Sequence, residues 1–180
     1  MFVVEGAEID LPRNLALIDT NILVAMADPD DQDHDYALLF LEEQDDFQLA
    51  VAPPVIAEAC SLLIGSRGRH DLAEWLLQWL LSPGSGVRLL PAPHGSPENA
   101  VQRYLGSDVA WMRQYKLDYV DAYLMQMAHQ ITSNCAFRPD LVIVTNDLRD
   151  FLRCFGGGYS YRIHNFSTGE TIDMGAYANS

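Results

Sequence analysis

Four acidic residues stand where the sequence predicts either the end of a strand or the first turn of a helix: Asp19, Glu58, Asp121 and Asp147. Glu58 is the lone charged residue in the apolar stretch 55–64. Burying it ionised without a compensating positive group would cost on the order of several kcal/mol. Hard divalent cations such as Mg²⁺ and Mn²⁺ prefer carboxylate oxygens, and acids gathered in one pocket repel each other until a cation relieves the repulsion. The pattern therefore points to metal chemistry.

Helix capping explains some of these acids without any function. Asp19 suits the N-cap of a helix that begins near Asn21. Asp118 suits the N-cap of the predicted helix 117–131, with Asp121 at its third helical position, where acids are also favoured. Asp118 and Asp121 are three residues apart, as are Asp147 and Asp150, so helix geometry leaves open which member of each pair faces the pocket. Asp118 and Asp150 are therefore kept as additional candidate acids.

The elements that must position the acids alternate between strands and helices. Apolar runs predict strands over 15–18, 47–51, 87–90 and 141–144. Periodic segments predict helices over 34–44, from the proline pair at 53–54 to 64, and over 71–81, 98–115 and 117–131. This alternation predicts an α/β fold, a three-layer sandwich with a central, mostly parallel sheet flanked by helices. Ligands of such sheets bind beyond the carboxyl ends of the strands, where Asp19 and Asp147 are expected.

Length and composition fit one globular domain. The chain has 180 residues, of which 49% are hydrophobic. We expect a lead-in over 1–13, a single domain over 14–166 and a tail over 167–180, the tail forming either an edge hairpin or a partner contact. The run 28–35, in which five of eight residues are Asp, is expected to be a solvated loop. Trp75 and Trp79, four apart on one helix face, indicate core or a dimer surface.

Charge and cysteine content narrow the function and the compartment. With 25 acidic and 11 basic residues the net charge is −14, which argues against sequence-independent binding of nucleic acid through a basic surface. The three cysteines have no CxxC spacing, so we expect core thiols in a reducing cytoplasm. The N-terminal residues do not show the pattern of a secretory signal, in which lysine or arginine precedes an apolar run. The apolar segment 72–81 is too short to cross a bilayer. We expect a soluble, cytoplasmic protein.

Four short motifs, in order, resemble those of PIN-domain ribonucleases. They are Asp19-Thr-Asn21 after a strand, Glu58 in Pro-Pro-x-x-x-Glu, Asp121-Ala in a Leu-x-x-x-Asp-Ala helix start, and Thr145-x-Asp147. The resemblance covers about residues 15–166, and the nearest branch looks like the VapC-like toxin nucleases. It implies a three-layer α/β fold, Mg²⁺ or Mn²⁺ held by Asp19, Glu58, Asp121 and Asp147, and hydrolysis of RNA phosphodiester bonds. It also implies, as candidate partners, an RNA substrate and a small basic antitoxin protein.

The remaining candidate residues surround these acids. Thr20, Asn21 and Thr145 are expected to hold the carboxylates in place by hydrogen bonds. Candidate RNA contacts on a local basic rim are Arg67, Arg69 and Arg149, with Lys116 and Arg153 beside them. An alternative to the nuclease is a non-catalytic PIN-like interaction module, in which the acids only cap helices and the acidic surface docks a basic protein. A homodimer is also expected as a candidate assembly.

Overall fold

A six-stranded sheet forms the centre of the molecule. The computed structural model describes residues 2–4, 7–9, 12–43, 46–90, 108–134, 139–154 and 159–175. The strand order is β5-β4-β3-β6-β7-β8. All neighbouring strands are parallel except β7 and β8, which pair antiparallel. The strands are β3 (Asn14–Ile18), β4 (Gln48–Val51), β5 (Arg88–Leu89), β6 (Asp140–Thr145), β7 (Arg162–Asn165) and β8 (Thr171–Asp173).

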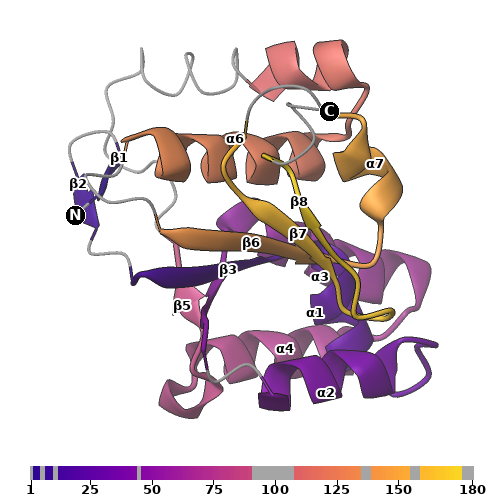
Figure 1. The fold of residues 1–180 in the computed structure, drawn as a ribbon. Helices are drawn as coiled ribbons and strands as arrows, with labels where there is room; N and C mark the ends of the chain where they lie inside the picture. The colour runs from indigo at the N-terminus through magenta and orange to yellow at the C-terminus, as the bar shows by residue number, and fades with distance from the viewer. Residues whose placement is uncertain are drawn as a thin grey trace.

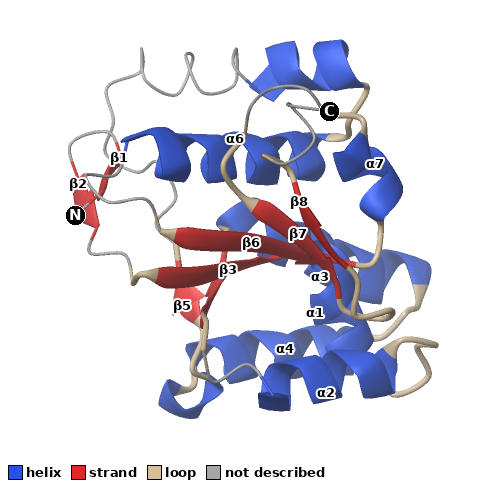
Figure 2. Ribbon diagram, viewed as in Figure 1, coloured by secondary structure: helices blue, strands red, loops and turns tan. Residues whose placement is uncertain are grey.

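Helices cover both faces of this sheet. Figure 1 shows α6 and α7 above it and α1, α2 and α4 below it, and Figure 2 shows the same three layers by type of element. Residues 108–115 are also helical. The remaining helices are α1 (Thr20–Ala27), α2 (His34–Glu43), α3 (Pro53–Ser61), η1 (Leu62–Ser66), α4 (His70–Leu81), η2 (Pro83–Ser85), α6 (Tyr119–Asn134) and α7 (Leu148–Leu152). The predicted three-layer α/β sandwich is therefore confirmed.

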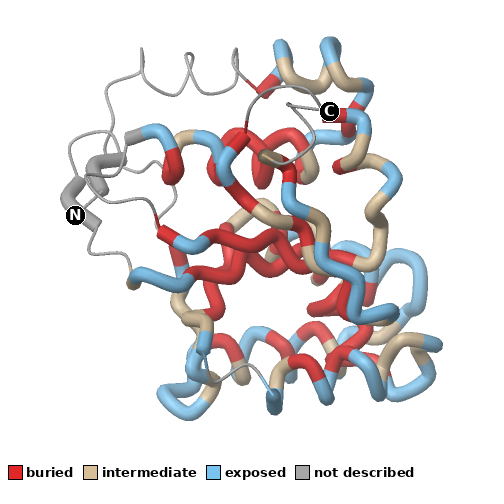
Figure 3. Tube along the Cα trace, in the orientation of Figure 1, coloured by how far each residue is buried: buried red, intermediate tan, exposed pale blue. Residues whose placement is uncertain are grey.

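The two central strands are buried because both of their faces are covered. Apart from the first residue of each, every residue of β3 and β6 is buried, and Figure 3 shows this buried centre in red. Such strands read as continuous apolar runs rather than as alternating ones. β3 and β6 pair in parallel from Asn14 with Asp140 to Ile18 with Val144. The carboxyl ends of these two strands therefore lie side by side, in the middle of the edge where the parallel strands end.

The ends of the chain add two small features. β1 (Phe2–Val4) and β2 (Ala7–Ile9) form an antiparallel pair within the expected lead-in. β8 lies within the expected tail and pairs with β7, so the sheet continues past residue 166 as an edge hairpin. Of the helix expected over 98–115, the part before residue 108 lies outside the described residues.

The tryptophan pair of α4 is divided between core and surface. The two rings stack, with centroids 6.4 Å apart. Trp79 packs against the core, whereas Trp75 is 44% exposed. The expected role of the pair in the core therefore holds for Trp79, and the homodimer stays a prediction.

The surroundings of the thiols fit the expectation that they belong to the core. Cys154 is buried and Cys60 is partly buried, and both are free. Cys135 lies outside the described residues. In the part of the chain that the structure describes, no helix combines the length and the apolar character needed to span a bilayer.

Candidate active site

The ends of β3 and β6 bring Asp19 and Thr145 together. The backbone N–H of Asp19 donates to the carbonyl of Val144 over 3.0 Å, which extends the strand pairing by one residue. The Thr145 hydroxyl then donates to Oδ2 of Asp19 over 2.8 Å. Residues 126 apart in sequence thus meet at the sheet edge where ligands bind in folds of this kind.

The carboxylate of Asp19 is buried and accepts three hydrogen bonds. Its Oδ1 accepts from the backbone N–H of Thr20 over 2.6 Å, and its Oδ2 accepts from Nδ2 of Asn21 over 2.9 Å as well as from Thr145. The pKa of Asp19 is raised to about 6, mainly by burial and also by the negative charges of Glu58 and Asp118, while the bonds from Thr145 and Thr20 act in the opposite direction. Asp19 is also the N-cap of α1, so the capping expected for this residue is confirmed, and its role as a site residue stays a prediction.

Thr145 is the centre of this network, and its hydroxyl is fully used. It donates to Asp19, accepts from Nδ2 of Asn21 over 2.9 Å and accepts from the backbone N–H of Asp147 over 3.0 Å. One donor and two acceptor positions are all that a hydroxyl offers. Asn21 and Thr145 both donate to the carboxylate of Asp19, and Thr145 also accepts from the backbone N–H of Asp147, which are the contacts that the expected supporting role requires.

Glu58 reaches the same region from α3. The helix starts at Pro53 and Pro54 after the extended residue Ala52, because proline suits the first helical turn. Glu58 lies within α3, partly buried, and its Oε2 accepts a hydrogen bond of 2.6 Å from the Thr20 hydroxyl. Thr20 thus links two of the four candidate acids, since its backbone N–H serves Asp19 and its side chain serves Glu58.

The structure distinguishes the two acids at the start of α6. Oδ1 of Asp118 accepts from the backbone N–H of Asp121 over 2.9 Å, which is the expected N-cap bond. The pKa of Asp121 is raised to about 8, first by burial and then by the negative charges of Asp19, Asp118, Asp150 and Asp147. Asp118 therefore caps the helix, and its charge also raises the pKa values of Asp121 and Asp19, so both acids of this pair lie near Asp19.

The pair at α7 is also distinguished. Asp147 is the N-cap residue of α7, yet its side chain makes no capping bond and is 47% exposed. Asp150 lies in the first turn, and its carboxylate forms ion pairs with Arg153 at 3.1 Å and with Arg149 at 3.5 Å. Asp150 thus interacts with its own helix through these two ion pairs. The carboxylate of Asp147 makes no capping bond, and the Arg149 guanidinium lies 4.0 Å from it.

The donor chemistry of these acids suits a hard divalent cation. Burial and mutual repulsion raise the pKa values of Asp19 and Asp121, so a positive charge placed among them would be stabilised. Within the described residues, however, no three side chains of the Asp, Glu, His or Cys type are arranged to hold an ion as they stand. The acids are near enough to repel each other without sharing a common centre.

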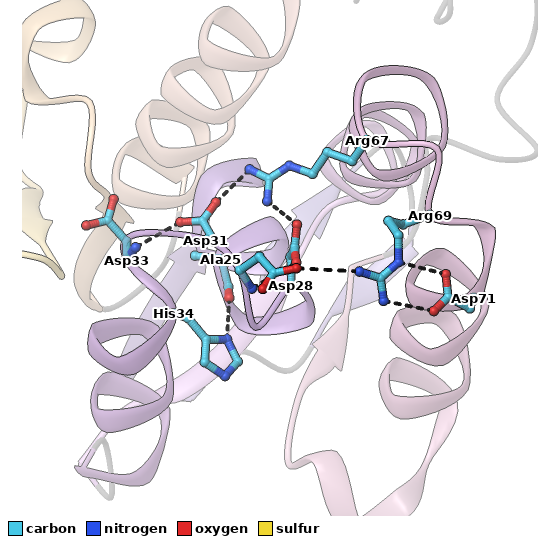
Figure 4. Close-up of polar contacts among 9 residues, drawn as sticks. Ala25, Asp28, Asp31, Asp33, His34, Arg67, Arg69 and Asp71 are labelled. Atoms are coloured by element: carbon cyan, nitrogen blue, oxygen red, sulfur yellow. Dashed lines mark hydrogen bonds and ion pairs between the residues drawn. The ribbon is translucent and has the colours of Figure 1, made fainter.

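Two of the three candidate RNA contacts are engaged elsewhere. Arg67 lies between Asp28 and Asp31 and pairs with both, and Arg69 pairs with Asp71 at 2.9 Å (Figure 4). Asp28 is the C-cap of α1, so this cluster lies at the opposite end of that helix, about 13.5 Å from Asp19 at about 1.5 Å per residue. The prediction of a solvated loop over 28–35 is therefore partly wrong, because Asp28 is buried and forms an ion pair with Arg67.

Arg149 is the candidate that lies at the site. Its side chain is 77% exposed, and its guanidinium is 4.0 Å from the carboxylate of Asp147. Arg153, on the same rim, donates to the carbonyl of Lys116 over 3.0 Å.

Sequence reasoning did not single out Asn146, Asp33 or Asn165. Asn146 lies between two motif residues, and hydrogen bonds tie it to Asp33 and to Asn165, of which Asp33 is 113 residues away in sequence. No local pattern signals a contact across such a distance.

Comparison with known proteins adds a family and several similar folds. The sequence matches the family model described as PIN domain over residues 16–154. VapC20 from Mycobacterium tuberculosis, described as a sarcin-ricin loop cleaving toxin, has a similar fold with 16% identity and a TM-score of 0.51, over 69% of this chain and 99% of that one. A toxin-antitoxin complex from Klebsiella pneumoniae matches with 20% identity and a TM-score of 0.46, over 76% and 89% of the two chains. PAE2754 from Pyrobaculum aerophilum matches with 24% identity and a TM-score of 0.46, over 78% and 84%. A comparison with curated protein sequences found no match.

Proposed function

Because the chain belongs to the PIN domain family, as its four motifs indicated, we propose that it is a metal-dependent endoribonuclease. Its active site would be formed by Asp19, Glu58, Asp121 and Asp147. The observation that carries the proposal is the hydrogen-bonded network where β3 and β6 end, in which Asn21 and Thr145 hold Asp19 and Thr20 joins Asp19 to Glu58. Carboxylates from separate parts of the chain repel each other where the central strands end. A bound cation would relieve this repulsion.

The residues of the chain supply fixed oxygen ligands. Asn21 and Thr145 hold the carboxylate of Asp19, and Thr20 holds that of Glu58, so these two ligands are already oriented, and the four carboxylates would draw together when an ion binds. When bound, Mg²⁺ or Mn²⁺ supplies a Lewis acid for phosphodiester hydrolysis and lowers the pKa of a coordinated water. The four acids would hold the cation, and the cation would in turn offset the repulsion between the acids and the RNA backbone.

We assign an RNA phosphate contact to Arg149. It is the candidate arginine that is both well exposed and close to one of the four acids. A guanidinium at this position would orient a phosphate toward the metal site. Arg67 and Arg69 are not part of this proposal, since their charges are offset by aspartates at the far end of α1.

The partner and the cellular setting are also proposals. We propose that the chain is the toxin of a toxin–antitoxin pair and acts in the cytoplasm. A net charge of −14 suits a small basic antitoxin, because complementary charge speeds and orients association. The names of VapC20 and of the Klebsiella complex refer to toxins, which is a further reason to test this role.

The test is cleavage of a labelled RNA by the purified chain in Mn²⁺, in Mg²⁺ and in chelator. Wild type should cleave only with metal. Asp147→Asn should lose at least about 10-fold in rate, the range seen when a metal site is weakened. Asp150→Asn, which removes one charge from the same short helix, is the matched control and should stay within a few-fold of wild type. RNA that stays intact in millimolar Mn²⁺ would contradict the proposal.

The same assay separates the nuclease from the non-catalytic interaction module. The acidic net charge of −14 favours that second candidate, since it suits the docking of a basic protein better than direct binding of RNA. In a pure docking module, Mn²⁺ would neither cause cleavage nor stabilise the fold.

A further inference from the structure

Asn146, the residue between the motif residues Thr145 and Asp147, has its backbone and its side chain held from three directions. Its backbone N–H donates to Oδ1 of Asn21 over 3.3 Å, and its side-chain Nδ2 donates to Oδ2 of Asp33 over 2.7 Å. Its carbonyl accepts from Nδ2 of Asn165 over 3.2 Å. These partners belong to α1, to the residue just before α2, and to β7. The turn that presents Asp147 is thus fastened to three separate elements.

The bond from Asn146 to Asp33 is the shortest of the three and the one that involves a charge. Hydrogen bonds to an ionised acceptor are roughly twice as strong as neutral ones. The other two bonds join neutral amide groups, and both are longer than 3.0 Å. Asp33 therefore contributes the strongest constraint on the position of Asn146.

Asp33 is itself held in place. Its backbone N–H donates to Oδ1 of Asp31 over 2.9 Å, and its carbonyl accepts the N–H of Ala37 in the first turn of α2. Asp31 in turn pairs with Arg67 at 2.6 Å (Figure 4). An anchored carboxylate can fix its partner, whereas a mobile one in a solvated loop would only move with it.

We propose that Asp33 is a positioning residue for the candidate active site, acting through Asn146 on Asp147. The inference rests on the proposed function for its effect on turnover, but the geometric claim stands independently. Asn146 and Asp147 are consecutive and share a peptide bond. A shift of Asn146 therefore moves the backbone N–H of Asp147, which donates to Thr145. Losing the bond to Asp33 would loosen one carboxylate of the site without removing any ligand. Supports of this kind affect metal affinity or activity by about 10- to 100-fold.

Two variants of Asp33 separate positioning from simple charge. Asp33→Ala removes both the acceptor and the charge, whereas Asp33→Asn removes the charge and keeps an oxygen that can accept from Asn146. Asp30→Ala is the matched control, because it removes a charge from the same loop at a side chain that is 90% exposed. We expect turnover with saturating Mn²⁺ to fall about 10-fold in Asp33→Ala, with KM for RNA unchanged. The turnover of Asp33→Asn should stay within about 3-fold of the wild-type value. The turnover of Asp30→Ala should equal that of wild type.

A double-mutant cycle tests whether the effect passes through Asn146. If it does, Asp33→Ala combined with Asn146→Ala should be no slower than the slower single variant, because both remove the same contact. Full additivity would overturn the proposal, as would equal loss in Asp33→Asn and Asp33→Ala.

Hydrogen exchange keeps the claim testable without catalysis. The amides of Asn146 and Asp147 should exchange faster in Asp33→Ala than in wild type or in Asp30→Ala, measured in chelator by NMR. If wild type proves inactive with every metal tried, the proposed function fails, while faster exchange in Asp33→Ala still supports the positioning role. Unchanged exchange at both amides would overturn the positioning role even in an active enzyme.

Discussion

Replacing Asp121 with asparagine should stabilise the metal-free protein at pH 8, although it removes a proposed ligand. Burial and the charges of Asp19, Asp118, Asp150 and Asp147 raise the pKa of Asp121 from 3.8 to about 8. The ionised carboxylate is therefore less stable in the folded chain than in the unfolded one. Asparagine has nearly the same shape and carries no charge, so it relieves both the repulsion and the desolvation of the ionised form.

The magnitude follows from the linkage between pKa and stability. At about 1.36 kcal/mol per pKa unit, a shift from 3.8 to about 8 corresponds to on the order of 5 kcal/mol at high pH. Asp121 is only partly buried, and its asparagine replacement must also be solvated, so we expect a gain of about 2 to 3 kcal/mol in the free energy of unfolding.

The sign of the pH dependence gives a second, independent check. Because the folded-state pKa is raised, between about pH 4 and pH 8 the folded chain keeps a proton that the unfolded chain has lost. The free energy of unfolding of wild type in chelator should therefore fall as pH rises through this window. Asp121→Asn should show a shallower fall, and the part that remains should lie mainly below about pH 6, where Asp19 titrates.

The assay is urea unfolding followed by tryptophan fluorescence, in chelator, at pH 5, 6, 7 and 8. Asp46→Asn, at an exposed residue outside the site, controls for loss of one charge from an acidic chain. Millimolar Mn²⁺ should stabilise wild type by mass action and stabilise Asp121→Asn much less. If Asp121→Asn is less stable than wild type at pH 8 in chelator, then burial and repulsion do not destabilise the ionised Asp121. The same conclusion follows if its free energy of unfolding changes with pH as steeply as that of wild type.

Variants at four other residues test the contacts of the site and of the Arg67 cluster. Asp147→Asn should weaken Mn²⁺ binding in calorimetry by at least about 10-fold, whereas Asp150→Asn should leave it within a few-fold and cost about 0.5 to 1 kcal/mol of stability through lost ion pairs. Arg67→Ala should cost about 2 kcal/mol at pH 7 in urea unfolding, since it leaves the buried Asp28 without its partner. Because Arg67 lowers the pKa of Asp28, this difference from wild type should persist above about pH 4 and shrink as pH falls below it, and KM for RNA should not change. Thr20→Val removes the hydroxyl donor to the glutamate of α3 and should slow turnover about 10-fold, with Thr20→Ser restoring it.

The sequence was informative wherever a local pattern determines the structure. The run 141–144 is buried on both faces, and its composition shows this directly, so the strand and the acid after it could be predicted. The capping role of Asp118 follows from its spacing to Asp121 along one helix, and the structure shows that bond. Family motifs then selected Asp121 over Asp118, a choice that helix geometry alone leaves open.

Contacts between distant loops were not predictable in this way. Arg67 and Asp28 are 39 residues apart, and no periodicity relates a residue that follows η1 to the end of α1. The run of aspartates at 28–35 has the composition of a solvated loop, and composition does not tell which acid will find a partner. The contact between Asp33 and Asn146 also joins the residue before α2 to the residue after β6, and only the folded chain brings these two positions together.

The central claim is that Asp19, Glu58, Asp121 and Asp147 hold a catalytic divalent cation. The most direct measurement is anomalous scattering from crystals soaked in Mn²⁺, with crystals of Asp147→Asn treated in the same way. We expect an anomalous peak within coordination distance of these carboxylates in wild type, at about 2.0 to 2.6 Å from their oxygens, and a weaker peak in the variant. A peak found only at the aspartates of 28–35, or none at all in millimolar Mn²⁺, would contradict it.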